Sequence, residues 1–342
     1  MADTTTQLAP RREVSTRNSS STSRLLRYLG ARLLGAAISL LAVIITSFFL
    51  FRILPGDPIR AMTHGIPMSV EQKEAMIREF GLDRPLAEQF WNYLAGLLRF
   101  DLGISFQYNR PITDMIIERL GPTLLLVGTS LFLAAALGLW LGVKSAWQHG
   151  SVTDRVHTGV AVTLWSVPSF WLGLILIVIF ASGLGWFPTT GMKTPGVTGF
   201  ATVLDVAHHM VLPVATLVAI AYAQYLMIMR SSLLDEMGSD YLLTARAKGL
   251  RDIAVRRRHG VPNALLPTVT LMFVNLGFIV FGAVLVETVF AWPGLGSLFY
   301  EGLKVPDLPL VQGLFVFFSS AVILMNLLAD LIYPILDPRV RP

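Results

Sequence analysis

The sequence of 342 residues contains no cysteine and few charged residues, and both absences restrict what the chain can be. Without cysteine there is no disulfide scaffold and no thiolate metal site. Only 14% of the residues are charged whereas 54% are hydrophobic, a composition typical of a membrane protein. The formal net charge of +5 does not indicate a nucleic-acid partner, because the arginines stand beside apolar runs, where lipid phosphates and orientation explain them better.

Motifs of ATPases and hydrolases are also missing. No stretch has the G-x-x-x-x-G-K-[ST] pattern that holds nucleotide phosphates, so energy for transport would come from a partner subunit. H-E-x-x-H is absent, and no Ser, His and Asp set suggests a protease triad. The adjacent His208 and His209 point to different helix faces and lack further ligands, so no metal site is predicted. We therefore expect a non-catalytic chain that binds no cofactor itself.

Six segments each contain an uncharged stretch long enough to cross about 30 Å of hydrocarbon as a helix, and the predicted spans extend past some of these stretches to charged residues at their ends. Because the backbone in lipid must satisfy its own hydrogen bonds, each stretch is expected to be helical. The fold class is predicted to be an all-α polytopic membrane protein with six transmembrane helices. The predicted spans cover residues 24–51, 123–143, 156–180, 210–230, 264–288 and 308–333.

Lysine and arginine predict the orientation. Of the 27 such residues, 17 lie in the stretch through Arg32, in residues 144–155, in residues 230–262 and after Tyr333. Since the cytoplasmic side of a membrane protein carries the Lys and Arg majority, both termini are predicted to be cytoplasmic. Residues 52–120 would then be an extracytoplasmic helical segment.

The rest of the chain divides by composition. Residues 1–23, rich in Ser, Thr and Arg, are predicted to be a disordered cytoplasmic tail. Residues 121–338 would form a five-helix permease core with a cytoplasmic loop at 231–262, and residues 339–342 a short cytoplasmic tail.

Two helices are predicted in the 52–120 segment. Ser69 and Gln72 suit a capping box before a helix that ends near Gly81. In the next stretch, apolar residues from Leu86 to Leu97 recur at helical spacing. We interpret it as an amphipathic helix on the bilayer or on the bundle, with contact to an incoming solute or its carrier as the alternative.

Between the fourth and fifth spans, the 38 mostly polar residues 230–267 are far more than a connector needs. Ser239 suits an N-cap, and Asp240 places negative charge at the positive end of a helix. Lys248 suits the last turn and Gly249 the left-handed position after it. The pattern predicts a short helix at the membrane surface that can transmit force to a partner outside the membrane.

Seven motifs occur in the order found in one known family. They are LPGDP at 54–58, FGLDRPLAEQFWNYLAGLLRFDLGISF at 80–106, SVPSFWLG at 166–173, DYLLTARAKGL at 240–250, NALLP at 263–267, ETVFAWPGLG at 287–296 and NLLADLIYPILDPRVR at 326–341. On these motifs the chain resembles the B-type integral permease subunit of the dipeptide, oligopeptide and nickel ABC importers of bacteria. The resemblance extends from about Arg24 to the C-terminus and implies a type I importer permease fold in the bacterial cytoplasmic membrane.

The resemblance also implies an assembly and an activity. The partners would be a second related permease in a heterodimer, two cytoplasmic ATP-binding subunits, an extracytoplasmic solute-binding protein and membrane lipids. The chain would move dipeptides or oligopeptides inward by alternating access, with ATP bound by the partner subunits. Nickel chelate and glutathione are alternative solutes. The rival class is a stand-alone ion-coupled secondary transporter, for which paired intramembrane acids and inverted repeats are not evident.

In the family that the chain resembles, the cytoplasmic loop carries a coupling helix, the EAA motif, which sits in a groove of the ATPase. Tyr241, Ala245 and Lys248 are spaced i, i+4 and i+7 and so are expected to share one face. The chain has Leu243 where the general motif has glutamate, which leaves the contact residue open. The predicted ATPase-coupling residues are Tyr241, Ala245, Arg246, Lys248 and Gly249.

Polar groups inside spans are costly in lipid and are therefore candidates for the translocation pathway. Gln224 lies in the fourth predicted span, Asn275 in the middle of the fifth, and Glu287 at its outer end. A structural role is equally compatible with each, for Glu287 through a cation such as Lys304.

Asn326 and Asp330 share one i, i+4 face of the sixth span. A structural role is favoured for both, and for Asp330 it would be an ion pair with an arginine.

Overall fold

The computed structural model describes residues 19–53, 69–79, 81, 83–265, 268–269, 272 and 283–336. Within these ranges the chain is helical, and the one pairing of β type is an isolated bridge between Ile104 and Pro111. The elements are α1 (Ser19–Ile53), α3 (Val70–Glu79), α4 (Leu86–Leu98), α5 (Ile112–Trp147), α6 (Val152–Trp165), α7 (Ser169–Leu176), the π-helix η1 (Ile177–Gly183), α8 (Phe200–Met237), α9 (Asp240–Ala247), α10 (Asp252–Val255), the π-helix η2 (Arg256–Gly260), α12 (Val284–Val289), α13 (Leu295–Lys304) and α14 (Leu308–Leu336). The all-α class is thereby confirmed.

Four helices of the described part are long and apolar enough to cross a membrane, and they lie in α1, α5, α8 and α14. A fifth candidate consists of α6 followed by α7 and η1. Most of the predicted span 264–288 lies outside the described residues, so the count of six stays a prediction. At the N-terminus α1 begins at Ser19, so residues 19–23 are helical rather than part of the predicted tail, because the apolar helix extends into its polar flank.

The predicted span 156–180 is broken in the structure. Its two halves, α6 and α7 with η1, are bent by 102° relative to each other. Pro168 stands at the N-cap of α7 with an extended backbone, φ −59° and ψ 132°. Proline cannot donate a helical hydrogen bond, and its ring keeps the residue before it out of the helical region, so the helix ends ahead of it.

The helices α5 and α8 pack side by side and form the centre of the bundle. Two glycines of α5, spaced four residues apart, allow the backbones to approach closely. A Cβ atom on Gly138 would lie 2.6 Å from the Tyr222 carbonyl oxygen, and one on Gly142 would lie 2.8 Å from the Leu226 carbonyl oxygen. In lipid there is no hydrophobic driving force between helices, so small residues promote association by allowing close van der Waals packing of the backbones.

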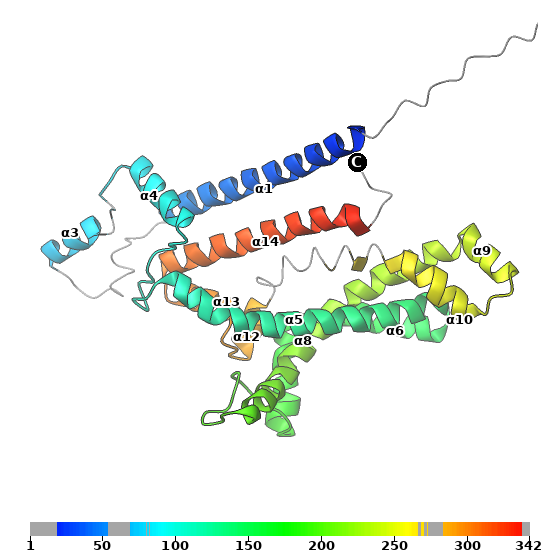
Figure 1. The fold of residues 1–342 in the computed structure, drawn as a ribbon. Helices are drawn as coiled ribbons and strands as arrows, with labels where there is room; N and C mark the ends of the chain where they lie inside the picture. The colour runs from blue at the N-terminus through cyan, green and yellow to red at the C-terminus, as the bar shows by residue number, and fades with distance from the viewer. Residues whose placement is uncertain are drawn as a thin grey trace, which may run out of the picture.

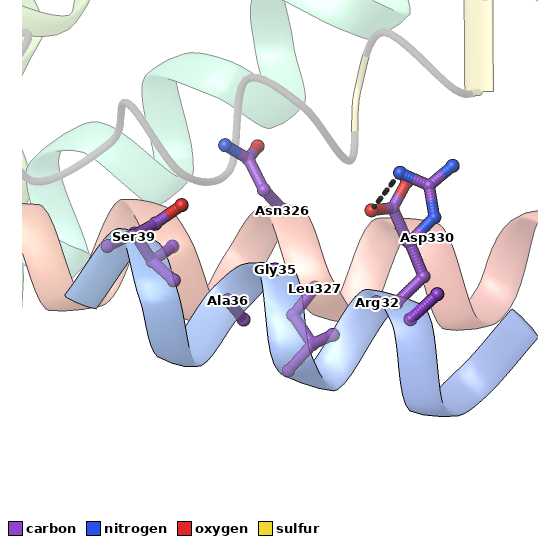
Figure 2. Close-up of a pocket in the computed structure, with 9 residues that line it drawn as sticks. Arg32, Gly35, Ala36, Ser39, Asn326, Leu327 and Asp330 are labelled. Atoms are coloured by element: carbon purple, nitrogen blue, oxygen red, sulfur yellow. Dashed lines mark ion pairs between the residues drawn. The ribbon is translucent and has the colours of Figure 1, made fainter. Parts of the chain in front are cut away.

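The helices α1 and α14 form a second pair, side by side in Figure 1. Arg32 makes an ion pair with Asp330 at 3.1 Å, as the sequence predicted for Asp330, and the Tyr28 hydroxyl donates to the Asp330 carbonyl oxygen. Figure 2 shows Asn326 and Ser39 beside this pair, lining an open pocket of about 280 Å³. The polar groups of this helix pair therefore gather on one side of it.

The segment between α1 and α5 contains both helices that the sequence predicts there. The capping box before α3 is confirmed, since the Ser69 amide donates to Gln72 Oε1 at 3.0 Å and the Gln72 amide donates to Ser69 Oγ at 3.2 Å. In α4, the Phe90 ring packs 5.3 Å from that of Phe48 on α1, whereas Trp91 is exposed. The helix α4 thus packs against α1 through Phe90, while Trp91 leaves apolar surface of the helix exposed.

Figure 1 shows how the ends of the bundle are arranged. The start of α1, the end of α14, and the helices α9 and α10 all lie at its right-hand side, and α3 and α4 lie at its left. We call residues 231–262 the docking loop, the end of α5 at Trp147 the loop end, and the end of α5 at Ile112 the far end.

Candidate functional site

The docking loop contains the short helix that the sequence predicts. Gly249 has φ +80°, its amide donates to the Arg246 carbonyl at 2.9 Å, and the Leu250 amide donates to the Ala245 carbonyl at 3.3 Å. These two bonds close the end of α9 in a Schellman motif. At the other end Ser239 occupies the N-cap with an extended backbone, but its side chain makes no capping hydrogen bond.

The buried face of α9 is not the predicted one. Leu242 is fully buried and Ala245 is 6% exposed, and both pack with Val255 and Trp147. The expectation that Ala245 shares an outward face with Tyr241 is therefore wrong. Residues spaced i and i+3 form the inward stripe of this two-turn helix, and its small alanine lets α9 approach its own chain.

The outward surface of the docking loop is partly apolar. Leu243 is 68% exposed, Ile253 61% and Leu250 37%, and Lys248 is exposed beside them. Exposed apolar side chains on an otherwise polar loop make it a candidate interaction surface. Leu243 is absent from the predicted coupling residues, because it departs from the glutamate of the general motif; its exposure in the structure is what identifies it.

Tyr241 is held by its neighbours in the chain. Its hydroxyl donates to a carboxylate oxygen of Glu236 near the end of α8, and it accepts a hydrogen bond at 3.0 Å from the side-chain amide of Asn263. Arg246 is likewise turned toward its own chain, with its Nε 3.8 Å from Asp252 Oδ1. These contacts orient the docking loop.

A buried ion pair fixes the start of α6 to α8 near the docking loop. Arg230 donates to both carboxylate oxygens of Asp154, from Nε at 2.7 Å and from Nη2 at 2.8 Å. The Gly150 amide donates a third hydrogen bond to Asp154. The Asp154 side chain is 5% exposed and the Arg230 side chain 20% exposed. Removing either residue would therefore leave the other charge buried and unpaired, which is strongly destabilising.

At the far end, Glu287 is fully buried and its carboxylate caps α13. Oε1 accepts from the Thr123 hydroxyl at 2.7 Å, and Oε2 accepts from the amides of Gly296 at 2.7 Å and Ser297 at 3.0 Å. Anions are stabilised at a helix N-terminus by its free amides and by its dipole. The expected partner Lys304 lies at the opposite end of the same helix. We call Glu287, Thr123, Gly296 and Ser297 the Glu287 cluster.

The glycines of the PGLG stretch make room for this carboxylate. A Cβ atom on Gly294 would lie 2.3 Å from the Glu287 carboxylate, and one on Gly296 would lie 2.6 Å from the Val284 Cα. Trp292, also fully buried, donates from its indole nitrogen to the Pro122 carbonyl at 3.0 Å. In this motif, one of the seven that carry the family resemblance, close packing explains the two glycines.

Further contacts hold the segment before α5 to the α13–α14 turn. Asp307 is buried and accepts hydrogen bonds from the Ser105 hydroxyl at 2.5 Å and the Gln107 amide at 3.0 Å. The Tyr108 hydroxyl donates to Glu301 at 2.8 Å. Burial and the neighbouring Glu301 carboxylate raise the pKa of Tyr108 to about 12, so this hydroxyl stays a donor at physiological pH.

The three predicted pathway residues are not brought into one site. Gln224 is exposed on α8, between the residues that pack on Gly138 and Gly142, whereas Glu287 contacts Thr123. Fifteen residues of α5 from Thr123 to Gly138 span roughly 22 Å at 1.5 Å per residue. Asn275 lies outside the described residues.

The two adjacent histidines have separate partners. His208 is 2.8 Å from the Trp186 carbonyl oxygen through Nε2, and His209 is 2.8 Å from the Asp205 carbonyl oxygen through Nδ1. Across the described ranges, no group of three or more His, Cys, Asp and Glu residues could hold a metal ion.

Comparisons with known proteins give the family. Residues 134–342 match the family described as binding-protein-dependent transport system inner membrane component, and residues 25–127 match its N-terminal companion. The glutathione transport system permease protein GsiC of Pectobacterium atrosepticum is 39% identical over 318 residues, 93% of this chain and 99% of the relative. Proteins of the same name from Salmonella choleraesuis and Escherichia coli K12 are 38% and 37% identical, with the same shares covered.

The resemblance drawn from the seven motifs is therefore confirmed, and so is the location as a multi-pass protein of the inner membrane. The match to the two family regions covers nearly all of the chain from residue 25 onward. The chain belongs to the family of inner membrane components of binding-protein-dependent transport systems, and it is a permease subunit of an ABC importer.

Proposed function

We propose that this permease subunit carries glutathione, or a small peptide closely similar to it, into the cytoplasm. The observation that carries the proposal is the group of relatives named glutathione transport permeases, which are 37–39% identical and align over 93% of this chain. Glutathione is a short peptide, so it falls within the peptide class that the motifs predict. Dipeptides, oligopeptides and nickel chelates are the solutes against which it must be tested.

The docking loop is the proposed contact for the ATPase subunits. Leu243 and Ile253 supply exposed apolar area and Lys248 a positive charge, a mixture suited to a groove on another protein. Of the other predicted coupling residues, Tyr241, Ala245 and Arg246 hold the loop in place, and Gly249 ends its helix. Movement of the ATPase subunits on hydrolysis would then displace the loop as one piece and drive alternating access.

The proposed importer contains a second related permease, two cytoplasmic ATP-binding subunits and an extracytoplasmic solute-binding protein. ATP binds the partner subunits, because this chain has no phosphate-binding motif. Gln224 and Asn275 are proposed to contribute to the pathway, since polar groups inside membrane spans are costly and are found at functional sites. Glu287 is left out of the pathway, because its carboxylate is enclosed by the cap of α13.

Uptake by the purified importer in proteoliposomes tests the function. With the binding protein and ATP present, labelled glutathione should accumulate, and unlabelled glutathione should compete at least about tenfold better than a dipeptide or a nickel chelate. Preferential uptake of a dipeptide or of nickel would overturn the solute. Accumulation that persists without the ATPase subunits would overturn the ATP-driven mechanism.

A further inference from the structure

Trp147, the last residue of α5, contacts every helix of the docking loop. Nothing in the sequence distinguishes Trp147, because a tryptophan near a membrane surface is ordinary. In the structure its indole nitrogen donates to Asp252 Oδ2 of α10 at 2.6 Å. The guanidinium carbons of Arg246 on α9 and Arg256 on η2 each lie 5.8 Å from its ring centroid, within the range of cation–π attraction.

The apolar part of the ring joins two groups of buried side chains. On one side it packs with Leu242, Ala245 and Val255, which are the core of the docking loop. On the other it packs with the core that α5 and α8 share at the loop end, which includes Leu233. A Cβ atom on Gly260 of η2 would lie 3.7 Å from Cζ3 of the ring, so the loop backbone also passes close by.

The docking loop is joined to the bundle at both of its ends. At its start, Gly238 and Ser239 lead from α8 to α9, and the Tyr241 hydroxyl adds a bond back to Glu236 of α8. At its end, η2 continues into the helical residues 261–265. The contacts made by Trp147 are a separate attachment, which ties α9, α10 and η2 to the end of α5.

The helix α5 leads from this attachment to the far end of the bundle. It is continuous from Ile112 to Trp147, and Figure 1 shows it running from the neighbourhood of α13 to that of α10. Thr123, a member of the Glu287 cluster, lies 24 residues before Trp147, about 36 Å along the helix. Thr123 Oγ1 also accepts the first amide of α13, from Leu295, at 2.8 Å.

We propose that Trp147 is a positioning residue that fixes the docking loop to α5, so that displacement of the loop is carried along α5 to the Glu287 cluster at the far end. The proposal rests on the proposed role of the docking loop in ATPase binding. Without the indole, the loop would stay joined to α8 through the chain and through Tyr241, but it would lose its attachment to the end of α5. ATP hydrolysis would then move the loop without moving α5.

The test compares variants of Trp147 in the assembled importer. Trp147→Ala removes all contacts of the ring, and Trp147→Phe keeps apolar packing without the hydrogen bond. Asp252→Asn keeps the ring but weakens its acceptor, together with the ion pair to Arg246. Trp140→Ala is the matched control, because Trp140 is 63% exposed two turns earlier on α5 and contacts Lys144 rather than the loop. The readouts are the ATPase subunits that copurify, ATP hydrolysis, and solute transported per ATP.

We expect Trp147→Ala to retain bound ATPase subunits and hydrolysis but to transport about tenfold less solute per ATP, a loss within the usual range of coupling between sites. Trp147→Phe should fall between it and the unaltered protein, and Trp140→Ala should match the unaltered protein. If Trp147→Ala lowers the amount of inserted permease, Trp147→Phe and Asp252→Asn carry the comparison. A ratio of transport to ATP unchanged in all three would overturn the proposal.

Other results would show that the proposed docking role of the loop itself is wrong. If the unaltered permease binds no ATPase subunits, or if Leu243→Ser leaves their binding unchanged, then the docking role of the loop is wrong. If the unaltered importer is coupled and Trp147 variants lose the ATPase subunits altogether, Trp147 acts in assembly rather than in transmission, and the proposal is also overturned.

Discussion

At the scale of single residues, Glu287 illustrates how an acid in an apolar bundle can be satisfied without a cation. Its carboxylate accepts hydrogen bonds from one hydroxyl and two backbone amides, all of which are buried. Removing the carboxylate would leave these donors without an acceptor, and an unsatisfied buried donor costs about 1–3 kcal/mol. The role expected from this geometry is to hold α13 against α5 and α12.

We predict that Glu287→Ala lowers the free energy of unfolding by about 3 kcal/mol or more, whereas Glu287→Gln lowers it by about 1 kcal/mol. The glutamine oxygen can still accept the two amides of α13, so it loses chiefly the charge. Thermal unfolding of the detergent-solubilised permease measures both. As a control, Glu118→Ala should have little effect, because Glu118 is 56% exposed and its ion pair with Arg110 faces solvent.

A different result would assign Glu287 to the translocation pathway after all. In that case Glu287→Gln would leave the unfolding temperature and the subunit content unchanged but would strongly reduce uptake.

At the scale of secondary-structure elements, the contact between α5 and α8 makes a sharp prediction. Gly138→Ala should destabilise the permease by about 1–3 kcal/mol, because its Cβ would press on backbone, which cannot move aside as a flexible side chain can. Gly128→Ala on the same helix is the control: nothing lies within 4 Å of its Cβ position, so it should be neutral or slightly stabilising. Equal unfolding temperatures for the two variants would refute the close packing.

The helix α9 makes a second prediction at this scale. Leu243→Ser should reduce copurifying ATPase subunits about tenfold, the effect of losing one apolar anchor at an interface. Leu303→Ser is the control, because Leu303 is also exposed, at 54%, but lies on α13 at the far end. Pull-down from membranes with quantified subunits gives the measurement. Equal loss in both variants would mean that any exposed leucine matters and that α9 is not the docking element.

Local signals predicted helix ends well. The capping box at Ser69 and the left-handed Gly249 depend on residues within a few positions, and the structure has both. The prediction of the exposed face of α9 was wrong at Ala245. Which side of this helix is buried depends on Val255 and Trp147, which lie elsewhere in the chain. Likewise Asp154 and Arg230 are 76 residues apart and have no periodic relation, so only the fold brings them together.

At the scale of the whole molecule, the orientation deduced from Lys and Arg stays a prediction, and the arrangement of the helices bears only on how many times the chain crosses the membrane. The start of α1, the end of α14 and the docking loop share one side in Figure 1. Chain ends on one side of a membrane require an even number of crossings. The described helices supply five candidates when the bent pair of α6 and α7 is counted as one, so residues 264–288 are predicted to supply the sixth.

The orientation itself is tested by single cysteines, which are simple to interpret in a chain that has none. We predict that a cysteine at Thr198, exposed just before α8, reacts with a membrane-impermeant maleimide in intact cells. A cysteine at Ala247, exposed on α9, should react only after the membrane is permeabilised. The reason is that the docking loop carries six Lys and Arg residues and Arg230 directly precedes it, and loops rich in these residues stay in the cytoplasm. Labelling of Ala247→Cys but not Thr198→Cys in intact cells would invert the topology, and with it the side from which ATPase subunits could reach α9.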